Sequence, residues 1–166
     1  YDRNIFLLNL KDIEKLFKDV HFVKEVHVKK IFPSKIKIKI INDKPIAKIY
    51  VRKDSFIITE SNKLVPTKNF NYDKVLPIVN GIDANKKFIS FYNFLIENNF
   101  PIKKIVQYNY FKIGRWDLYL DDLKIIKLPS SDYKKIVNNI NTILSDIRFQ
   151  NKHVLDFRVK NKMIID

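Results

Sequence analysis

The stretch FPSKIKIKIINDKPIAKI, residues 32–49, decides how this chain folds and where it divides. Lysine and isoleucine alternate through Lys35–Ile40, which is the period-two pattern of a half-buried strand. Just upstream, residues 22–30 alternate valines with polar side chains, and Pro33–Ser34 lies between the two runs as a turn. The sequence therefore predicts a two-stranded antiparallel ribbon with one apolar face.

A short helix is expected before this ribbon, over about ten residues within residues 9–20. Asn9 can accept a hydrogen bond at the helix start, and Asp12 follows three residues later as a weaker form of the capping box. Ile5–Leu8 is expected to precede the helix as extended chain. Because a two-stranded ribbon is marginal alone, we expect the helix to pack on the isoleucine face of the ribbon.

The pattern changes after Asp43 and Pro45, which end the second strand. One helix is expected to begin at Asp83, and another, the longest of the chain, is expected to be capped by Ser130 or Ser131. Short strand candidates occupy residues 46–51, 55–60, 63–66, 75–81, 103–113, 115–121, 124–129, 154–159 and 162–166. Three of them, within residues 103–129, are expected to form a meander.

These elements predict an α+β fold in two domains. Residues 1–43 hold a helix plus a two-stranded antiparallel ribbon, and residues 44–166 hold a mixed, mainly antiparallel sheet with two helices. Trp116 shares strand parity with Leu118 and Leu120, so we expect it to anchor a core face rather than a stacking platform for nucleic acid. No internal repeat is visible.

A net charge of +14 raises the question of nucleic-acid binding. The cations are 27 lysines and only five arginines, although arginine is the preferred residue for bidentate phosphate contacts. An AT-rich genome would produce the same excess of lysine, isoleucine and asparagine. We therefore expect no nucleic-acid partner.

The sequence contains few residues in patterns typical of catalytic or metal-binding sites. Gly81 and Gly114 are the two glycines, so a phosphate-cradling loop is not expected, and cysteine is absent. None of the three histidines pairs with another at metal-ligand spacing, and His27 is interpreted as a solvated side chain. Asp121–Asp122 is interpreted as a hairpin turn and Ser130–Ser131 as a helix cap. We expect no catalytic residue, metal or cofactor. No apolar run reaches the length of a membrane span, and we expect the chain to be the soluble part of a longer product.

The order of these motifs resembles the periplasmic part of the FtsQ/DivIB cell-division family, with the alphaproteobacterial branch as the nearest likeness. Helix, ribbon and NDKPIAKI, residues 42–49, look like the second half of a POTRA domain and its exit segment. FIITESNKLV, LPIVNG, GRWDLYLDDLKIIKLP and VLDFRVKNKMII look like successive strands of the family's β domain. Asp43 and Lys44 stand where the family has Glu and Arg, and Leu123 stands where a turn glycine is common.

The resemblance implies a partial POTRA domain over residues 1–43 and an FtsQ-type β domain over residues 44–166. It also implies a scaffold of the division machinery at the septum, on the periplasmic face of the inner membrane, held there by a span outside this chain. The implied partners are the FtsB–FtsL pair, with FtsW, FtsI and FtsK as further candidates. Binding would proceed by strand addition at the last strand of the sheet.

The partner-binding residues expected on this basis lie at the last strand and beneath it, at Lys162, Met163, Ile164, Ile165, Val159 and Ile147. The alternative for Met163 and Ile165 is that they complete the core. Two other functions stay open. One is a POTRA module of an outer-membrane assembly or secretion system, and the other is a basic single-strand nucleic-acid binder.

Overall fold

A computed structural model describes residues 5–69, 72, 74–160 and 162–166 of the chain. Its helices are α1 (Leu10–Leu16), α2 (Ala84–Glu97) and α3 (Lys134–Ser145), with short 3₁₀ helices η1 (Ile5–Leu7), η2 (Thr67–Asn69), η3 (Ile102–Lys104) and η4 (Ile147–Phe149). Its strands are β1 (Val23–Ile31), β2 (Lys35–Asn42), β3 (Pro45–Val51), β4 (Asp54–Thr59), β5 (Leu64–Pro66), β6 (Ile78–Asn80), β7 (Ile105–Phe111), β8 (Arg115–Leu120), β9 (Ile125–Lys127), β10 (Val154–Asp156) and β11 (Ile164–Ile165).

The predicted ribbon is present. Strands β1 and β2 pair antiparallel, and the turn between them contains Pro33–Ser34. Val28 pairs with Ile38 on one face, while Lys29 pairs with Lys37 on the other. Period-two alternation therefore predicted both the pairing and the two faces correctly.

The helix before the ribbon is shorter than expected. Asn9 caps α1 through a hydrogen bond from Lys11 N to Asn9 Oδ1 (3.1 Å), but the helix ends at Leu16. Beyond it the backbone bonds become one residue tighter, as in Lys18 N to Lys15 O, which marks 3₁₀-like turns rather than α-helix. Ile5–Leu7 is a 3₁₀ helix, so the expected extended lead-in is wrong.

This short helix does not cover the isoleucine face. Seven helical residues span about 10 Å, whereas the eight residues of β2 span about 27 Å. Ile36, Ile38 and Ile40 accordingly remain between 40% and 46% exposed. The expectation that the helix buries them is therefore not met.

A single nine-stranded sheet follows, in the order β11-β10-β9-β8-β7-β6-β3-β4-β5. The pairs β3–β6, β6–β7 and β9–β10 are parallel and the other five are antiparallel, so the predicted mixed, mainly antiparallel sheet is confirmed. The meander β7-β8-β9 is also confirmed. The backbone passes from one sheet to the other between Asn42 and Pro45, and a domain boundary at residues 43 and 44 remains our prediction.

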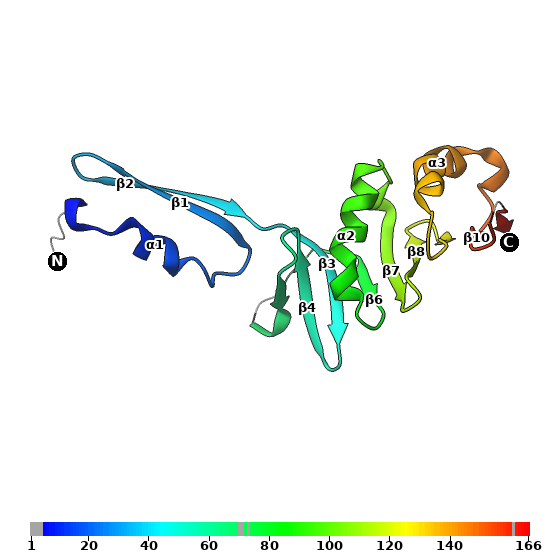
Figure 1. Ribbon diagram of the computed structural model, residues 1–166, viewed down its shortest axis with the longest axis horizontal. Coiled ribbons are helices and arrows are strands. Elements are labelled where there is room, and N and C mark those ends of the chain that lie inside the picture. Colours follow the sequence, from blue (N-terminus) through cyan, green and yellow to red (C-terminus); the bar gives the residue numbers. More distant parts are fainter. Residues whose placement is uncertain (1–4, 70–71, 73, 161) are drawn as a thin grey trace.

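Both long helices pack on the same face of this sheet and close one core (Figure 1). Trp116 is buried and its ring stacks on that of Phe91, with centroids 4.6 Å apart, while Phe88 meets Tyr108 edge-on at 5.0 Å. Val137 and Ile140 of α3 complete the cluster. Trp116 is therefore a core residue, as its strand parity predicted.

The starts of the long helices differ in detail from the expectation. Asp83 does sit at the N-cap of α2, but its carboxylate pairs with Lys86 Nζ at 2.9 Å instead of capping the backbone. Helix α3 begins after Tyr133, because the left-handed backbone of Asp132 (φ 57°) prevents helix at that residue. Ser130 and Ser131 are therefore not caps, and α2, with 14 residues, is longer than α3, with 12.

Candidate partner-binding edge

Strand β11 is the last strand of the nine-stranded sheet, and no strand of the described residues lies beyond it. It pairs antiparallel with β10, Leu155 opposite Ile165 and Asp156 opposite Ile164. Its two isoleucine side chains are 53% and 40% exposed at Ile164 and Ile165. The edge of β11 that faces away from β10 is therefore open for pairing.

The hydrogen bonds fix which backbone groups point outward. Val154 and Asp166 exchange both bonds, each 3.3 Å from nitrogen to oxygen. In an antiparallel ladder bonded and non-bonded pairs alternate, so Ile165 opposite Leu155 belongs to a non-bonded pair. The N–H and C=O of Ile165 consequently point away from the sheet, whereas those of Ile164 point toward β10.

The side chains of β11 divide between the two faces of the sheet. Ile165 lies in register with Leu155 and Ile126, which are core residues under the helices. Met163 is half-buried and packs against the same core. Ile164 lies in register with Asp156 and Lys127 on the opposite face. Of the predicted residues in β11, Ile164 is therefore the one that contributes least to the core.

A cavity of about 970 Å³ adjoins the segment that leads into β11. Its walls come from the β7–β8 turn, the start of β8, the loop before α3, the first turn of α3 and the chain after β10. Five of its lining side chains are cationic, and they are Arg115, Lys135, Arg158, Lys160 and Lys162. Among its described lining residues Asp132 is the one that carries a carboxylate, so the cavity favours an acidic occupant.

Arg158 is fixed at the wall of this cavity by Asp156. Its Nε donates to both carboxylate oxygens at 2.8 and 2.9 Å, its Nη2 donates to Oδ2 at 2.5 Å, and its backbone N donates to Oδ1 at 3.0 Å. Asp156 is only 7% exposed. The hydrogen bonds from Arg158 outweigh the effect of burial and hold the pKa of Asp156 below its usual range. The guanidinium is therefore pre-organised.

Arg115 is held more loosely. Its Nε lies 3.3 Å from Asp117 Oδ1, but neither atom makes a hydrogen bond within the described residues. Its guanidinium lies over the ring of Phe111, 3.9 Å from the centroid. Asp117 is 5% exposed, and burial raises its pKa although Arg115, Arg158 and Lys127 act in the opposite direction. The guanidinium of Arg115 therefore lies at the cavity wall with its Nε buried and, among the described residues, without a hydrogen bond.

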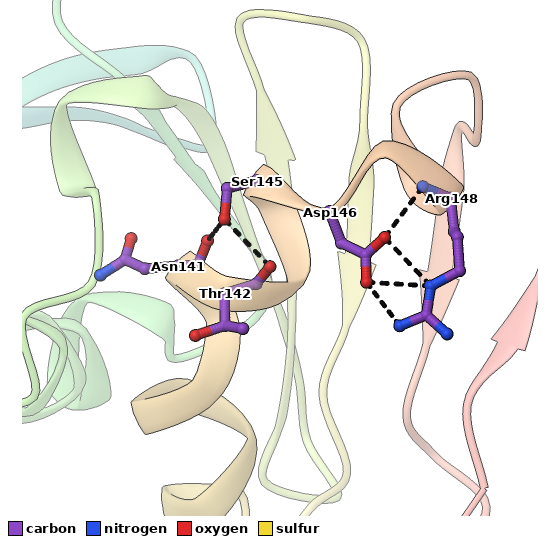
Figure 2. Close-up of polar contacts among 5 residues, drawn as sticks. All are labelled: Asn141, Thr142, Ser145, Asp146 and Arg148. Carbon is purple, nitrogen blue, oxygen red and sulfur yellow. Dashed lines mark hydrogen bonds and ion pairs between the residues drawn. The ribbon is translucent and has the colours of Figure 1, made fainter.

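Ile147 lies on η4, directly after α3. Figure 2 shows the polar contacts that shape this corner. Ser145 Oγ donates to Asn141 O at 2.9 Å and to Thr142 O at 3.1 Å, which closes α3. Asp146 then accepts from the backbone N (2.9 Å) and the Nη2 (2.6 Å) of Arg148, so the turn presents Ile147 with 78% exposure.

The structure brings most of the predicted residues together and leaves one apart. Val159, Lys162 and Met163 line the cavity, and Ile164 and Ile165 form the adjacent edge. Ile147 does not line it. The sequence reasoning missed Arg115 and Arg158, although both lie in the quoted strand motifs GRWDL and LDFRV and are two of five arginines in a lysine-rich chain.

The edge and its cavity together have features of a protein-binding site. The described residues include no cluster of three or more His, Asp or Glu able to hold a metal ion. An exposed strand edge, an apolar pair of side chains and a basic cavity are the features that recognise an extended acidic peptide. Each helix within the described ranges is too short or too polar to cross a bilayer.

Comparisons with known proteins identify related sequences. A family model described as "POTRA domain, FtsQ-type" matches residues 1–41. The Cell division protein FtsQ of Rickettsia bellii is 30% identical over 165 residues, which are 98% of this chain and 61% of that protein. The Rickettsia typhi protein of the same name is 28% identical over 169 residues, with the same two coverages. The chain thus spans about three fifths of the length of the curated relatives it matches.

A likeness to a solved structure is more distant. The major extracytoplasmic domain of DivIB from Geobacillus stearothermophilus, in its trans isomer, aligns with 67% of this chain and 98% of its own length. The TM-score is 0.45 and the sequence identity is 15%, which is too low to support an inference about this chain.

The ribbon and the matched segment place the chain among proteins that carry an FtsQ-type POTRA domain. The similarity to proteins named Cell division protein FtsQ extends over nearly the whole chain. The resemblance to FtsQ cell-division proteins that the sequence motifs predicted is therefore confirmed.

Proposed function

We propose that this chain is the periplasmic part of a division scaffold that binds the FtsB–FtsL pair by strand addition at β11. The observation that carries the proposal is the outward-facing backbone of Ile165 at the end of a nine-stranded sheet, next to a basic cavity. A partner strand would bond to Ile165, and an acidic segment beside it would enter the cavity. FtsW, FtsI and FtsK remain further candidate partners, and a catalytic role is not part of the proposal.

The predicted site residues have distinct roles in this proposal. Ile164 and Ile165 form the pairing edge, Met163 supports it from the core, and Lys162 and Val159 join the edge to the cavity. Arg158 adds a fixed cation for carboxylates, and Arg115 adds a second cation that is held more loosely. Ile147 would contact a partner segment that extends past the cavity toward η4.

No observation favours the two other functions that the sequence left open. Tandem POTRA modules would require a second helix-and-ribbon unit after Asp43. The chain forms one nine-stranded sheet there instead. Arginines are few on the exposed strands, and the aromatic cluster around Trp116 is buried. We therefore place this chain at the septum, with its membrane anchor in the part of the protein outside these 166 residues.

Proline at position 165 tests strand addition directly. Ile165→Pro removes an N–H that points outward, so the ladder with β10 stays intact while one donor to the partner is lost. We expect tenfold or greater loss of affinity for the FtsB–FtsL pair of the same organism, measured by biolayer interferometry. Ile165→Val, which keeps the donor and most of the side chain, should bind as the unchanged protein does.

Two further variants complete the test. Ile164→Pro removes an N–H that bonds to β10, so it should lower the urea midpoint, whereas Ile165→Pro should not. Ile164→Asp places a charge at the exposed edge and should weaken binding while the far-UV circular dichroism is unchanged. Full binding by both Ile165→Pro and Ile164→Asp would show that the partner docks elsewhere.

A further inference from the structure

The lysine face of the β1–β2 ribbon is a second exposed surface, separate from the β11 edge. Register places His27 opposite Lys39, Lys29 opposite Lys37 and Ile31 opposite Lys35 on this face. All four lysines and His27 are exposed. The face therefore carries four lysine charges within a strip two strands wide.

The charges on this face are poorly neutralised by the protein itself. Lys29 lies directly opposite Lys37, a pairing that destabilises an antiparallel ladder. Glu25 lies 3.4 Å from His27 Nε2, and within the described residues no carboxylate forms an ion pair with any of Lys29, Lys35, Lys37 or Lys39. An external anionic surface would relieve this repulsion.

The opposite face of the ribbon is the one that α1 approaches. Phe17, the C-cap residue of α1, and Val26 of β1 line a common cavity of about 380 Å³. Val26 pairs with Ile40 and therefore belongs to the apolar face. Within the described residues no helix covers the lysine face, whose four lysines are exposed, and the ribbon lies at the far end of the molecule from β11 (Figure 1).

The composition of the lysine face selects among anionic partners. Its cations are all lysines, which act as point charges, and it offers neither the arginine forks nor the aromatic rings that nucleic-acid surfaces use. Eight residues of regular strand give a face about 27 Å long. A long, narrow strip of lysines fits a flat surface that carries many negative charges better than a ligand with a single ionised group.

We propose that the lysine face of β1–β2 lies against an anionic phospholipid bilayer. A lysine near an anionic membrane surface gains about fivefold in binding, so four lysines give a gain of roughly several hundredfold over a neutral bilayer. The contact would be electrostatic, without insertion of the apolar face. With the ribbon on the membrane, the β11 edge would stand at the distal end of the molecule.

The test is co-sedimentation of the full 166-residue chain with vesicles. Vesicles of phosphatidylcholine with 30% phosphatidylglycerol should bind it, and pure phosphatidylcholine vesicles should not. The variant with Lys29, Lys35, Lys37 and Lys39 all changed to Gln should lose at least 100-fold in affinity. A control with Lys53, Lys87, Lys103 and Lys134 changed to Gln has the same net charge and should lose less than threefold, because these exposed lysines lie outside the ribbon.

The outcomes separate the proposal from its rivals. Binding that falls steeply between 50 and 500 mM NaCl supports it. Equal losses in the two lysine variants would show that net charge alone acts, and binding that survives high salt would show insertion of the apolar face. A duplex oligonucleotide bound as tightly as the anionic vesicles, with the same loss in the ribbon variant, would mean that the face recognises phosphate in nucleic acid. Each of the last three results would overturn the proposal.

Discussion

Asp156 and Asp117 should respond in opposite ways to the same substitution, although both are buried carboxylates in one register row. Lys127 lies between them, paired with Asp117 on one side and with Asp156 on the other. Hydrogen bonds from Arg158 hold the pKa of Asp156 below its usual range, whereas burial raises the pKa of Asp117. The charge of Asp156 therefore stabilises the fold, and the charge of Asp117 opposes it.

The expected magnitude follows from the contacts. Asp156→Asn keeps an acceptor for Arg158 N but loses the charged bonds to Nε and Nη2. A hydrogen bond to a charged group contributes about 1.5–3 kcal/mol, and the partial exposure of Arg158 places the loss near the lower end, at about 1.5–2 kcal/mol. Asp117→Asn removes a charge whose burial outweighs its attractions, so the free energy of unfolding should stay constant or rise.

Urea denaturation followed by the fluorescence of Trp116, the single tryptophan, measures both effects at pH 7. The pH dependence of the free energy of unfolding shows whether each carboxylate stabilises or destabilises the fold. The stabilisation from Asp156 is complete above its unfolded pKa, about 3.9, and is lost as pH falls through the lower folded value. The penalty from Asp117 develops as pH rises from about 3.9 toward its raised folded value. If both variants lose the same stability at pH 7, the assignment of opposite roles is refuted.

Three further predictions concern stability away from the edge. Asp43→Ala should cost about 2–3 kcal/mol in urea denaturation, because buried Asp43 accepts hydrogen bonds from both the backbone N and the Oγ of Ser61; an unchanged urea midpoint would contradict this. Leu123→Gly should raise the free energy of unfolding by about 0.5–1 kcal/mol, because exposed Leu123 adopts a left-handed φ of 67° that glycine adopts without strain. The control Leu123→Ala should change the free energy of unfolding little. A loss of stability in the glycine variant would show that the leucine side chain is needed. Gly81→Ala should destabilise the fold by about 3 kcal/mol, because φ of Gly81 is +122° and a Cβ there would lie 2.2 Å from Tyr110 O. A thermal midpoint within about 1 °C of that of the unchanged protein would refute this prediction.

Short-range pattern predicted the elements where one face of an element is buried. Alternation of valine with polar residues gave β1, and the parity of Trp116, Leu118 and Leu120 gave the core face of β8. Pattern failed where a single backbone angle decided the boundary. The left-handed conformation of Asp132 moves the start of α3 past Ser131, and the local sequence does not predict this backbone conformation.

The cavity beside β11 could not be predicted for a different reason. Arg115 and Arg158 are 43 positions apart in the sequence, yet both line the same cavity. They do so because β9 lies between β8 and β10, pairing antiparallel with β8 and parallel with β10. Local periodicity carries no information about such a pairing. The resemblance to a known family located the last strand, and the structure added the basic wall that stands next to it.

The dimensions of β11 limit how a partner can bind. A strand of two residues offers few outward backbone groups, and each net hydrogen bond contributes only about 0.5–1.5 kcal/mol. Association alone costs at least about 4 kcal/mol in lost freedom of motion. In the proposed complex the edge would fix the register and direction of a partner strand but would not hold the partner alone. Most of the affinity would come from the adjacent cavity, where Arg158 is already immobilised by Asp156 and would lose little freedom on binding.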